Sequence, residues 1–421
     1  MLSRRRLIGD SLLVFLNISF SYTLIPYLLF GGIHRFLCAL AIVIINTVYT
    51  LIFFCGKFNV GRNPAMYAII FLNLVNIVSS YLTNTGWQAA LVSMVLLLSF
   101  YMLLCNIYRD YQIHCVDFSK RIFYLFRGYF WLVAINIVSC TLLFVLSTIG
   151  ISINNNNVSY NYDLFTSNVE NLGATYYFPF HLGVVNYSPY DVRIPFFQDQ
   201  GFILGFYHEP HTLTFMLYPA LFMLLYYYRN RRYIIVTAFL FISLLASSTT
   251  NILCILLVSL LYLLYLSRSN LRKLITILSV CFLIIYLGFA YIDFSVFDFI
   301  FLKLESSSSG YSQNMIEYAF TPKTLWGTNC FDTTEMTSFG NAANKDVGWI
   351  KFSINLLFLC VIIVNGIKLF LSNSKMSLPV LLFVSYFFFH SSKVAMSTYS
   401  LTMLPFVCFV LFILNNKKEQ I

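Results

Sequence analysis

Charged residues are scarce in this sequence. Asp, Glu, Lys and Arg make up 10% of the 421 residues, whereas a typical soluble domain has about a quarter. Hydrophobic residues make up 59% and aromatic residues 19%. A chain with so few charges could not cover a soluble surface, so the composition excludes ordinary soluble domains and predicts an integral membrane protein.

Motifs of soluble chemistry are also missing. The sequence has no Walker-type phosphate loop, no convincing dinucleotide fingerprint, no G-x-S-x-G elbow and no H-E-x-x-H pair, which argues against an ATP-driven or redox enzyme. It contains 10 cysteines but no CxxC and no Cys/His cluster with zinc-like spacing. Most of these cysteines lie within apolar runs and are interpreted as small membrane-helix residues. We therefore expect neither a metal nor a cofactor.

What the sequence does contain is a series of apolar runs of about twenty residues, the length that crosses a bilayer as a helix. The predicted fold class is an all-α integral membrane protein with about 12 transmembrane helices and two large outer-side loops. The expected spans are Ser11–Phe30, Phe36–Cys55, Ala65–Tyr81, Trp87–Cys105, Tyr129–Ile149, Pro210–Tyr228, Tyr233–Ala246, Asn251–Leu266, Leu274–Tyr291, Gly348–Ile367, Leu378–His390 and Ser397–Leu414.

These spans divide the chain into five parts. Residues 1–149 hold spans one to five, 150–209 form a first large outer (periplasmic) loop, 210–291 hold spans six to nine, 292–347 form a second outer loop, and 348–421 hold the last three spans and a cytoplasmic tail. The runs Asn154–Asn157 and Ser306–Ser309 are expected to be disordered or turn-rich. Aromatic residues in both loops suit either carbohydrate binding or an interfacial aromatic belt.

The charges predict the orientation. Lys and Arg concentrate in cytoplasmic loops, and with a cytoplasmic N-terminus, 19 of the 26 basic residues fall on the inner side while 12 of the 16 acidic residues fall on the outer side. The formal net charge of +10 is thereby attributed to membrane topology. Nucleic acid is not an expected partner. Both termini are expected in the cytoplasm.

One segment combines ionisable residues with a helix entry. Pro210 suits the first turn of the sixth span, which would make Glu209 its cap, with His208 and His211 beside it. A carboxylate is favoured at a helix N-terminus, and the free N–H groups there can also bind an anion. Two alternatives stay open: a purely structural helix cap, and a helix that already includes Gly201–Tyr207 and bends at Pro210.

The same segment, from Gly205 through Glu209 and Pro210 to Phe215, resembles the G-x-x-x-E-P segment of the O-antigen polymerase (Wzy) family. The run Leu244–Leu253 resembles a Ser/Thr-rich turn between two later spans of that family. Further along, Met315–Asn329, with Pro322-Lys-Thr-Leu-Trp-Gly, resembles the family's segment in the second large outer loop. The resemblance covers about half the chain and includes the span count and the loop layout.

The sequence departs from the family pattern in its basic residues. The position seven residues before the glutamate, where relatives often carry arginine, is Phe202, and the nearest upstream arginine is Arg193. The second outer loop offers only lysines where many relatives have an arginine. Glu209 and Pro210 therefore match the pattern better than any cationic residue does.

The resemblance implies a membrane-embedded glycosyltransferase of the bacterial inner membrane. It would transfer a growing chain from undecaprenyl pyrophosphate to the next lipid-linked oligosaccharide repeat unit, in contact with the lipid bilayer and with a chain-length regulator membrane protein as a partner. Such a reaction requires a base for the acceptor hydroxyl and cations for the leaving pyrophosphate. The candidate catalytic residues are Glu209, His211 and Arg193, and the candidate substrate-binding residues are His208, Lys323, Arg35, His390 and Lys393.

Three other classes fit a chain of this kind. An O-antigen ligase, which transfers finished polymer to lipid A core, has the same fold and loop layout and differs in its acceptor. A flippase or secondary transporter should show two related halves and ionisable groups near the membrane midplane, and neither is found in the sequence. A membrane protein with a purely structural role is the third alternative.

Overall fold

The structure is a computed structural model in which part of the chain is described. The described residues are 4–22, 32–54, 87–115, 117–148, 157–159, 174–177, 182–185, 202–205, 213–245 and 258–263, with short helical positions at 67, 70–71, 73–74, 77–78, 81, 265–266, 275–276, 279, 364, 378–379 and 381–382.

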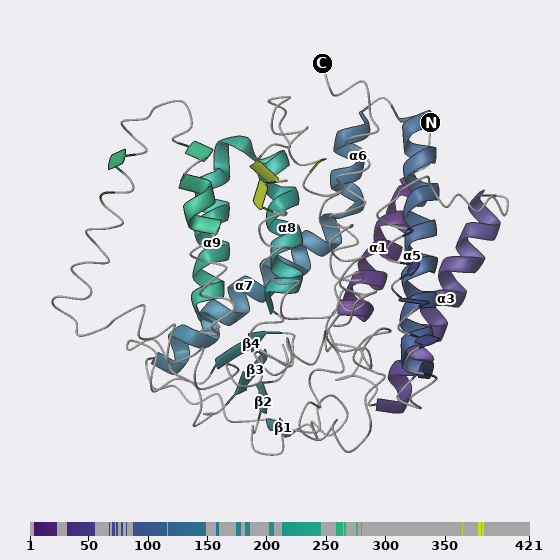
Figure 1. Cartoon of the computed structure of the whole chain (residues 1–421), viewed down its shortest axis with the longest axis horizontal. Helices are drawn as coiled ribbons and strands as arrows, with labels where there is room; N and C mark the ends of the chain where they lie inside the picture. Colours follow the sequence, from purple (N-terminus) through teal and green to yellow (C-terminus); the bar gives the residue numbers. More distant parts are fainter. Residues whose placement is uncertain are drawn as a thin grey trace, which may run out of the picture.

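Three helices form the N-terminal group, namely α1 (Arg4–Tyr22), α3 (Gly32–Phe54) and α5 (Trp87–His114). All three contact one another (Figure 1). Helix α5 contains neither Gly nor Pro, so nothing in its sequence interrupts the helix. Its 28 residues extend about 42 Å at ~1.5 Å per residue, which exceeds the ~30 Å of a hydrocarbon core. The sequence correctly predicts these three helices. It starts the first at Ser11 and ends the third at Cys105, whereas α1 begins at Arg4 and α5 continues to His114.

Residues between the fourth and fifth expected spans also form helix. Helix α6 covers Phe118–Leu125 and α7 covers Arg127–Thr148. Backbone hydrogen bonds continue through the turn between them, from Phe126 N to Ile122 O at 3.2 Å and from Phe130 N to Phe126 O at 3.0 Å. Helix α7 contacts both α1 and the later helices, so it joins the N-terminal group to the rest of the described chain (Figure 1).

A helical hairpin follows the first outer loop of the sequence prediction. It consists of α8 (Leu213–Tyr227), a short 3₁₀ turn η4 (Arg229–Arg231) and α9 (Arg232–Leu245). Tyr228 N donates to Leu224 O at 2.9 Å and Arg231 N donates to Tyr228 O at 3.1 Å, so the turn keeps its backbone hydrogen-bonded. The hairpin agrees with the sixth and seventh expected spans.

Four short strands lie in the segment predicted as the first outer loop. They are β1 (Asn157–Ser159), β2 (Ala174–Tyr177), β3 (Leu182–Val185) and β4 (Phe202–Gly205). They form one antiparallel sheet in the order β1-β2-β3-β4, with an irregularity between Gly183 and Val184. The all-α prediction therefore holds for the apolar segments and misses this sheet. The alternative in which residues 201–207 extend the following helix is wrong, because β4 is a strand paired with β3.

Helices α3 and α7 have inverted polarity, which means that apolar side chains are exposed and polar side chains are buried. One exposed face of α7 carries large apolar side chains at helical spacing, namely Trp131, Ile135, Val138 and Leu142. The other side of α7 buries Asn136, which is 0% exposed. Helix α3 likewise exposes eight large apolar side chains, each between 43% and 65% exposed: Leu37, Leu40, Ile44, Ile45, Val48, Leu51, Ile52 and Phe53. In a water-soluble protein an apolar surface of this extent would have to be covered.

Among the described residues, only α3 has both the length and the apolar composition to cross a membrane, over Leu37–Phe54. The apolar stretches Arg127–Leu142, Leu217–Tyr227 and Arg232–Ile242 are shorter. The apolar segments that are described are helical, and the number of twelve spans stays a prediction.

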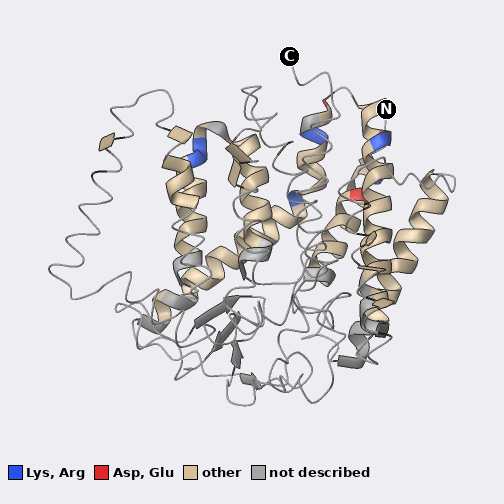
Figure 2. Cartoon of the chain, in the orientation of Figure 1, with Lys and Arg blue, Asp and Glu red and all other residues tan. Residues whose placement is uncertain are grey.

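Basic residues gather at one end of the described helices. Ser11 of α1 donates its hydroxyl to Tyr124 O and Leu125 O of α6, at 3.0 and 3.3 Å. The Phe123 ring of α6 lies 4.9 Å from that of Tyr227, at the end of α8. The start of α1, helix α6 and the η4 turn therefore lie close together, and Figure 2 shows their Lys and Arg residues in the half of the molecule away from the sheet.

Candidate functional site

Most of the residues predicted to form the site lie outside the described part of the chain. These are Arg193, His208, Glu209, His211, Lys323, His390 and Lys393. Arg35 belongs to the first turn of α3, and only its backbone is described. In the sequence, Glu209 belongs to the connection between the end of β4 at Gly205 and the start of α8 at Leu213.

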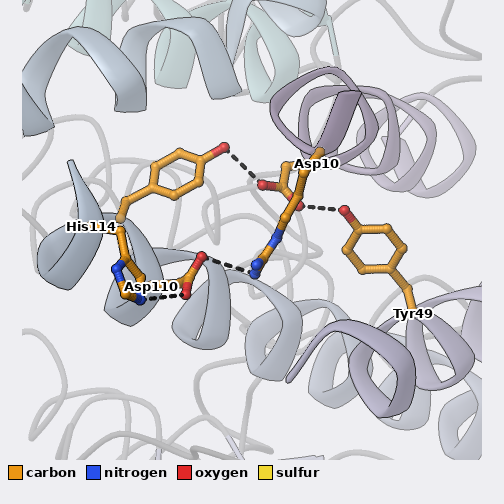
Figure 3. A network of polar contacts seen from close by, with 6 residues as sticks. Asp10, Tyr49, Asp110 and His114 are labelled. Carbon is orange, nitrogen blue, oxygen red and sulfur yellow. Dashed lines mark hydrogen bonds and ion pairs between the residues drawn. The ribbon is translucent and has the colours of Figure 1, made fainter. Parts of the chain in front are cut away.

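The polar residues that the structure does bring together form a different cluster, which we call the α1–α3–α5 cluster: Arg6, Asp10, Tyr49, Asp110, Tyr111 and His114 (Figure 3). At its centre is the Asp10 side chain, which is 1% exposed. The Tyr49 hydroxyl donates to Asp10 Oδ1 at 2.6 Å, and the Tyr111 hydroxyl donates to Oδ2 at 2.9 Å. Both oxygens of this carboxyl group are thus hydrogen-bonded by phenols from two other helices.

An ion pair lies beside Asp10. The Arg6 guanidinium is 2.9 Å from Asp110 Oδ2, and His114 Nε2 is 3.6 Å from Asp110 Oδ1. Arg6 also lies over the Phe54 ring, 4.9 Å from its centroid, which adds a cation–π attraction. The aromatic end of α3 and the polar end of α5 therefore both contact the first turns of α1.

Sequence spacing explains why these residues meet. Arg6 and Asp10 are four residues apart, so they share one face of α1. Asp110 and His114 share one face of the last turns of α5 in the same way, and α5 reaches α1 because it continues beyond its apolar part. From the sequence alone, Asp10 and Asp110 are two of the four acidic residues expected on the inner side. The sequence feature that could have predicted this cluster is a carboxylate just outside each of two spans that end on the same side of the membrane.

Burial determines the electrostatics of the cluster. Asp10 precedes the first expected span and Tyr111 follows the fourth. Burial raises the pKa of the Asp10 carboxyl, while the hydrogen bonds from Tyr49 and Tyr111 and the charge of Arg6 act in the opposite direction. Burial also raises the pKa of the Tyr111 phenol, and the neighbouring Asp10 adds to that rise. The Tyr111 phenol therefore stays protonated as a donor, and the hydrogen bonds to Asp10 connect α1, α3 and α5.

A second set of hydrogen-bonded side chains connects α1, α3 and α5 at another position along these helices. The side-chain amides of Asn17 on α1 and Asn46 on α3 exchange two hydrogen bonds of 2.8 Å. Asn46 also donates to the Ser99 hydroxyl of α5 at 3.1 Å. Both asparagines are 1% exposed or less. Amides paired across helices in this way stabilise helix association where water is absent.

The hydrogen bonds and ion pairs of both described clusters connect helices to one another, and only the α1–α3–α5 cluster lies at the end of the helices that carries the basic residues. No family model, no curated protein and no solved structure matches the chain.

Proposed function

We propose that this chain is a multi-spanning protein of the bacterial inner membrane that polymerises lipid-linked oligosaccharide repeat units on the outer face. About twelve helices would cross the bilayer, with both termini in the cytoplasm. Its substrates would be undecaprenyl-pyrophosphate-linked oligosaccharides, and its product a longer surface polysaccharide such as O-antigen.

The inverted polarity of the helices supports the membrane part of this proposal. The exposed faces of α3 and α7 carry large apolar side chains, whereas Asn17, Asn46 and Asn136 are buried. Lipid tails would cover such faces without cost, and the buried amides would hold neighbouring helices together. The basic residues at one end of the helices (Figure 2) agree with the excess of Lys and Arg on the cytoplasmic side of membrane proteins.

The observation that carries the catalytic part is the position of the Gly205-x-x-x-Glu209-Pro210 segment in the chain. It joins β4 to α8, and Figure 1 shows β4 and the sheet at the end of the helices opposite the η4 turn. If the basic end faces the cytoplasm, the sheet faces outward. Four residues span at most about 14 Å, so Glu209 stays close to the outer end of α8, where a lipid-linked substrate would present its pyrophosphate.

The proposed reaction is a glycosyl transfer. A hydroxyl of the acceptor repeat unit attacks the anomeric carbon of the donor chain, Glu209 removes the proton of that hydroxyl, and the bond from the anomeric carbon to the pyrophosphate oxygen breaks. The lipid pyrophosphate leaves with the bonding electrons, and cationic side chains stabilise its charge. His211 is the alternative base, and Arg193 and Lys323 are the first cations to test.

The decisive test is Glu209→Gln in a strain that lacks the chromosomal gene. Gln keeps the size of the side chain and can still accept a helix-end hydrogen bond, so a structural cap would lose only about 1 kcal/mol or less. A general base contributes roughly 10²–10⁴-fold to the rate, so we expect long-chain polysaccharide to disappear from gels while the protein still reaches the membrane. Glu170→Gln, in the same expected outer loop, is the matched control.

The glycans that accumulate in the deletion strain distinguish the alternatives. A polymerase defect leaves single repeat units on lipid A, a ligase defect leaves lipid A without repeat units, and a flippase defect leaves repeat units on the inner face. Normal long chains in the Glu209→Gln strain would make the glutamate a cap, and the base would then have to be sought in residues 292–347.

A further inference from the structure

Arg232, the first residue of α9, is a buried cation that has no carboxylate partner within the described part of the chain. The residue is 8% exposed, and among the described residues its Nε has no hydrogen-bond partner. Its guanidinium carbon lies 5.9 Å from the centroid of the Tyr265 ring, which is its one described aromatic contact. A guanidinium taken out of water is costly unless an anion or several acceptors satisfy it.

A second polar group with no partner lies beside it. Tyr262 is 6% exposed, and its hydroxyl finds no partner within the described part of the chain. Residues 262 and 265 are three apart on a helix, so they share a face, and the Tyr262 ring stands edge-on to that of Tyr233 at 6.1 Å. Counting only the described residues, Tyr262 and Arg232 therefore present two donors without acceptors at the same junction, between α9 and the helix that contains residues 258–263.

The surrounding sequence provides no anion. Residues 210–292 contain Arg229, Arg231, Arg232, Arg268, Arg272 and Lys273 but not a single Asp or Glu. The N-terminus of α9, a helix of 14 residues, adds a partial positive charge at the same place. An excess of donors and positive charge, in a stretch of the sequence from 210 to 292 that contains no acidic residue, favours an anionic ligand from outside the chain.

The neighbouring surface indicates what carries the anion. Tyr233 and Ile234 follow Arg232 directly and are 65% and 70% exposed. In the membrane orientation proposed above, on which this step depends, these two side chains would face lipid at the level of the inner headgroups. An anion with an apolar tail would cover the exposed side chains and satisfy the buried donors at once.

We propose that Arg232 and Tyr262 form a binding site for the phosphate of an anionic phospholipid in the inner leaflet. The planar guanidinium matches two phosphate oxygens through paired N–H groups, and the Tyr262 hydroxyl donates to an oxygen of the same phosphate. Exposed Arg231 lies at the edge of the site and contributes only screened, long-range attraction.

The test uses the full chain purified in detergent and reconstituted into vesicles of phosphatidylcholine with or without phosphatidylglycerol. Native mass spectrometry of re-extracted protein measures retained phosphatidylglycerol, and thermal unfolding measures the stabilisation it causes. We expect Tyr262→Phe to weaken retention roughly tenfold, because one charge-assisted hydrogen bond is lost. Arg232→Lys keeps the charge but loses the paired N–H geometry, and should weaken retention to a similar extent.

Arg231→Gln is the matched control, because it removes one exposed charge from the adjacent position and should leave retention nearly unchanged. Equal losses in all three variants would overturn the proposal, since they would indicate a diffuse basic surface. Inorganic phosphate alone should not reproduce the stabilisation, and full stabilisation by phosphate would show that the ligand is the free ion. The Glu209→Gln protein should retain phosphatidylglycerol normally, so failure of the polymerase proposal and failure of this site give different results.

Discussion

At the scale of single residues, Asp10 illustrates how a charge is accommodated among apolar helices. A buried carboxylate is costly unless hydrogen bonds satisfy its oxygens, and here Tyr49 and Tyr111 donate one hydrogen bond to each oxygen. The two phenols come from different helices, so the carboxylate fixes the relative positions of α1, α3 and α5. Removing one phenol hydroxyl therefore affects a tertiary contact and leaves the local helix unchanged.

Tyr111→Phe should lower the free energy of unfolding by about 1.5–3 kcal/mol, because a hydrogen bond to a charged group is lost and one Asp10 oxygen stays buried without it. Unfolding of the purified protein in mixed detergent micelles provides the measurement. Tyr124→Phe, which removes the hydroxyl of a 50% exposed tyrosine, is the control and should change little. If adding Asp10→Asn to Tyr111→Phe gave a strictly additive loss, the two side chains would not be coupled as described.

At the scale of elements, the close approach of α1 and α7 depends on a glycine. A methyl group added at Gly128 would lie 3.0 Å from Phe15 Cβ, an atom that cannot move unless α1 moves. At Gly9 the nearest atom would be the Tyr49 hydroxyl at 3.3 Å, at the end of a side chain, so the overlap is smaller. Gly128 thus tests a close contact with an atom attached directly to the α1 backbone, and Gly9 tests a looser contact with the end of a side chain.

Gly128→Ala should therefore destabilise the protein by about 1–2 kcal/mol, because overpacking costs more than the gain in helix propensity. Gly9→Ala carries the same gain in propensity and should be less damaging. Both variants can be compared by the midpoint of thermal unfolding in detergent. A Gly128→Ala protein at least as stable as the original chain would contradict the α1–α7 contact.

At the scale of the whole molecule, the distribution of charge predicts orientation. A periplasmic phosphatase reporter should be inactive when fused after Arg232 and active when fused after Asn157 or Ser309, since the basic end of the helices is expected in the cytoplasm. A cytoplasmic reporter at the same positions should give the opposite pattern. Phosphatase activity after Arg232 would refute the proposed topology from the sixth span onward.

For the described helices α1, α3, α5, α7, α8 and α9, the sequence by itself determined the approximate positions, because runs of apolar residues have few alternatives to a helix. It did not determine where α5 ends, since Asn106–His114 is polar enough to be taken for a loop and becomes helix through contacts with α1 and α6. The strand β4 was also missed, because four residues of Phe, Ile, Leu and Gly become a strand only by pairing with β3.

For the site, the sequence provides the candidates Glu209, His211 and Arg193 from a motif, and their role stays a prediction. What only the tertiary structure decided is which polar residues meet. Asp10 and Tyr111 are 101 residues apart in the chain, and Arg232 of α9 contacts Tyr265 of a later helical segment. Apolar periodicity specifies which residues are helical, but a hydrogen bond between distant residues depends on how those helices are placed against one another, and no local pattern in the sequence encodes that placement.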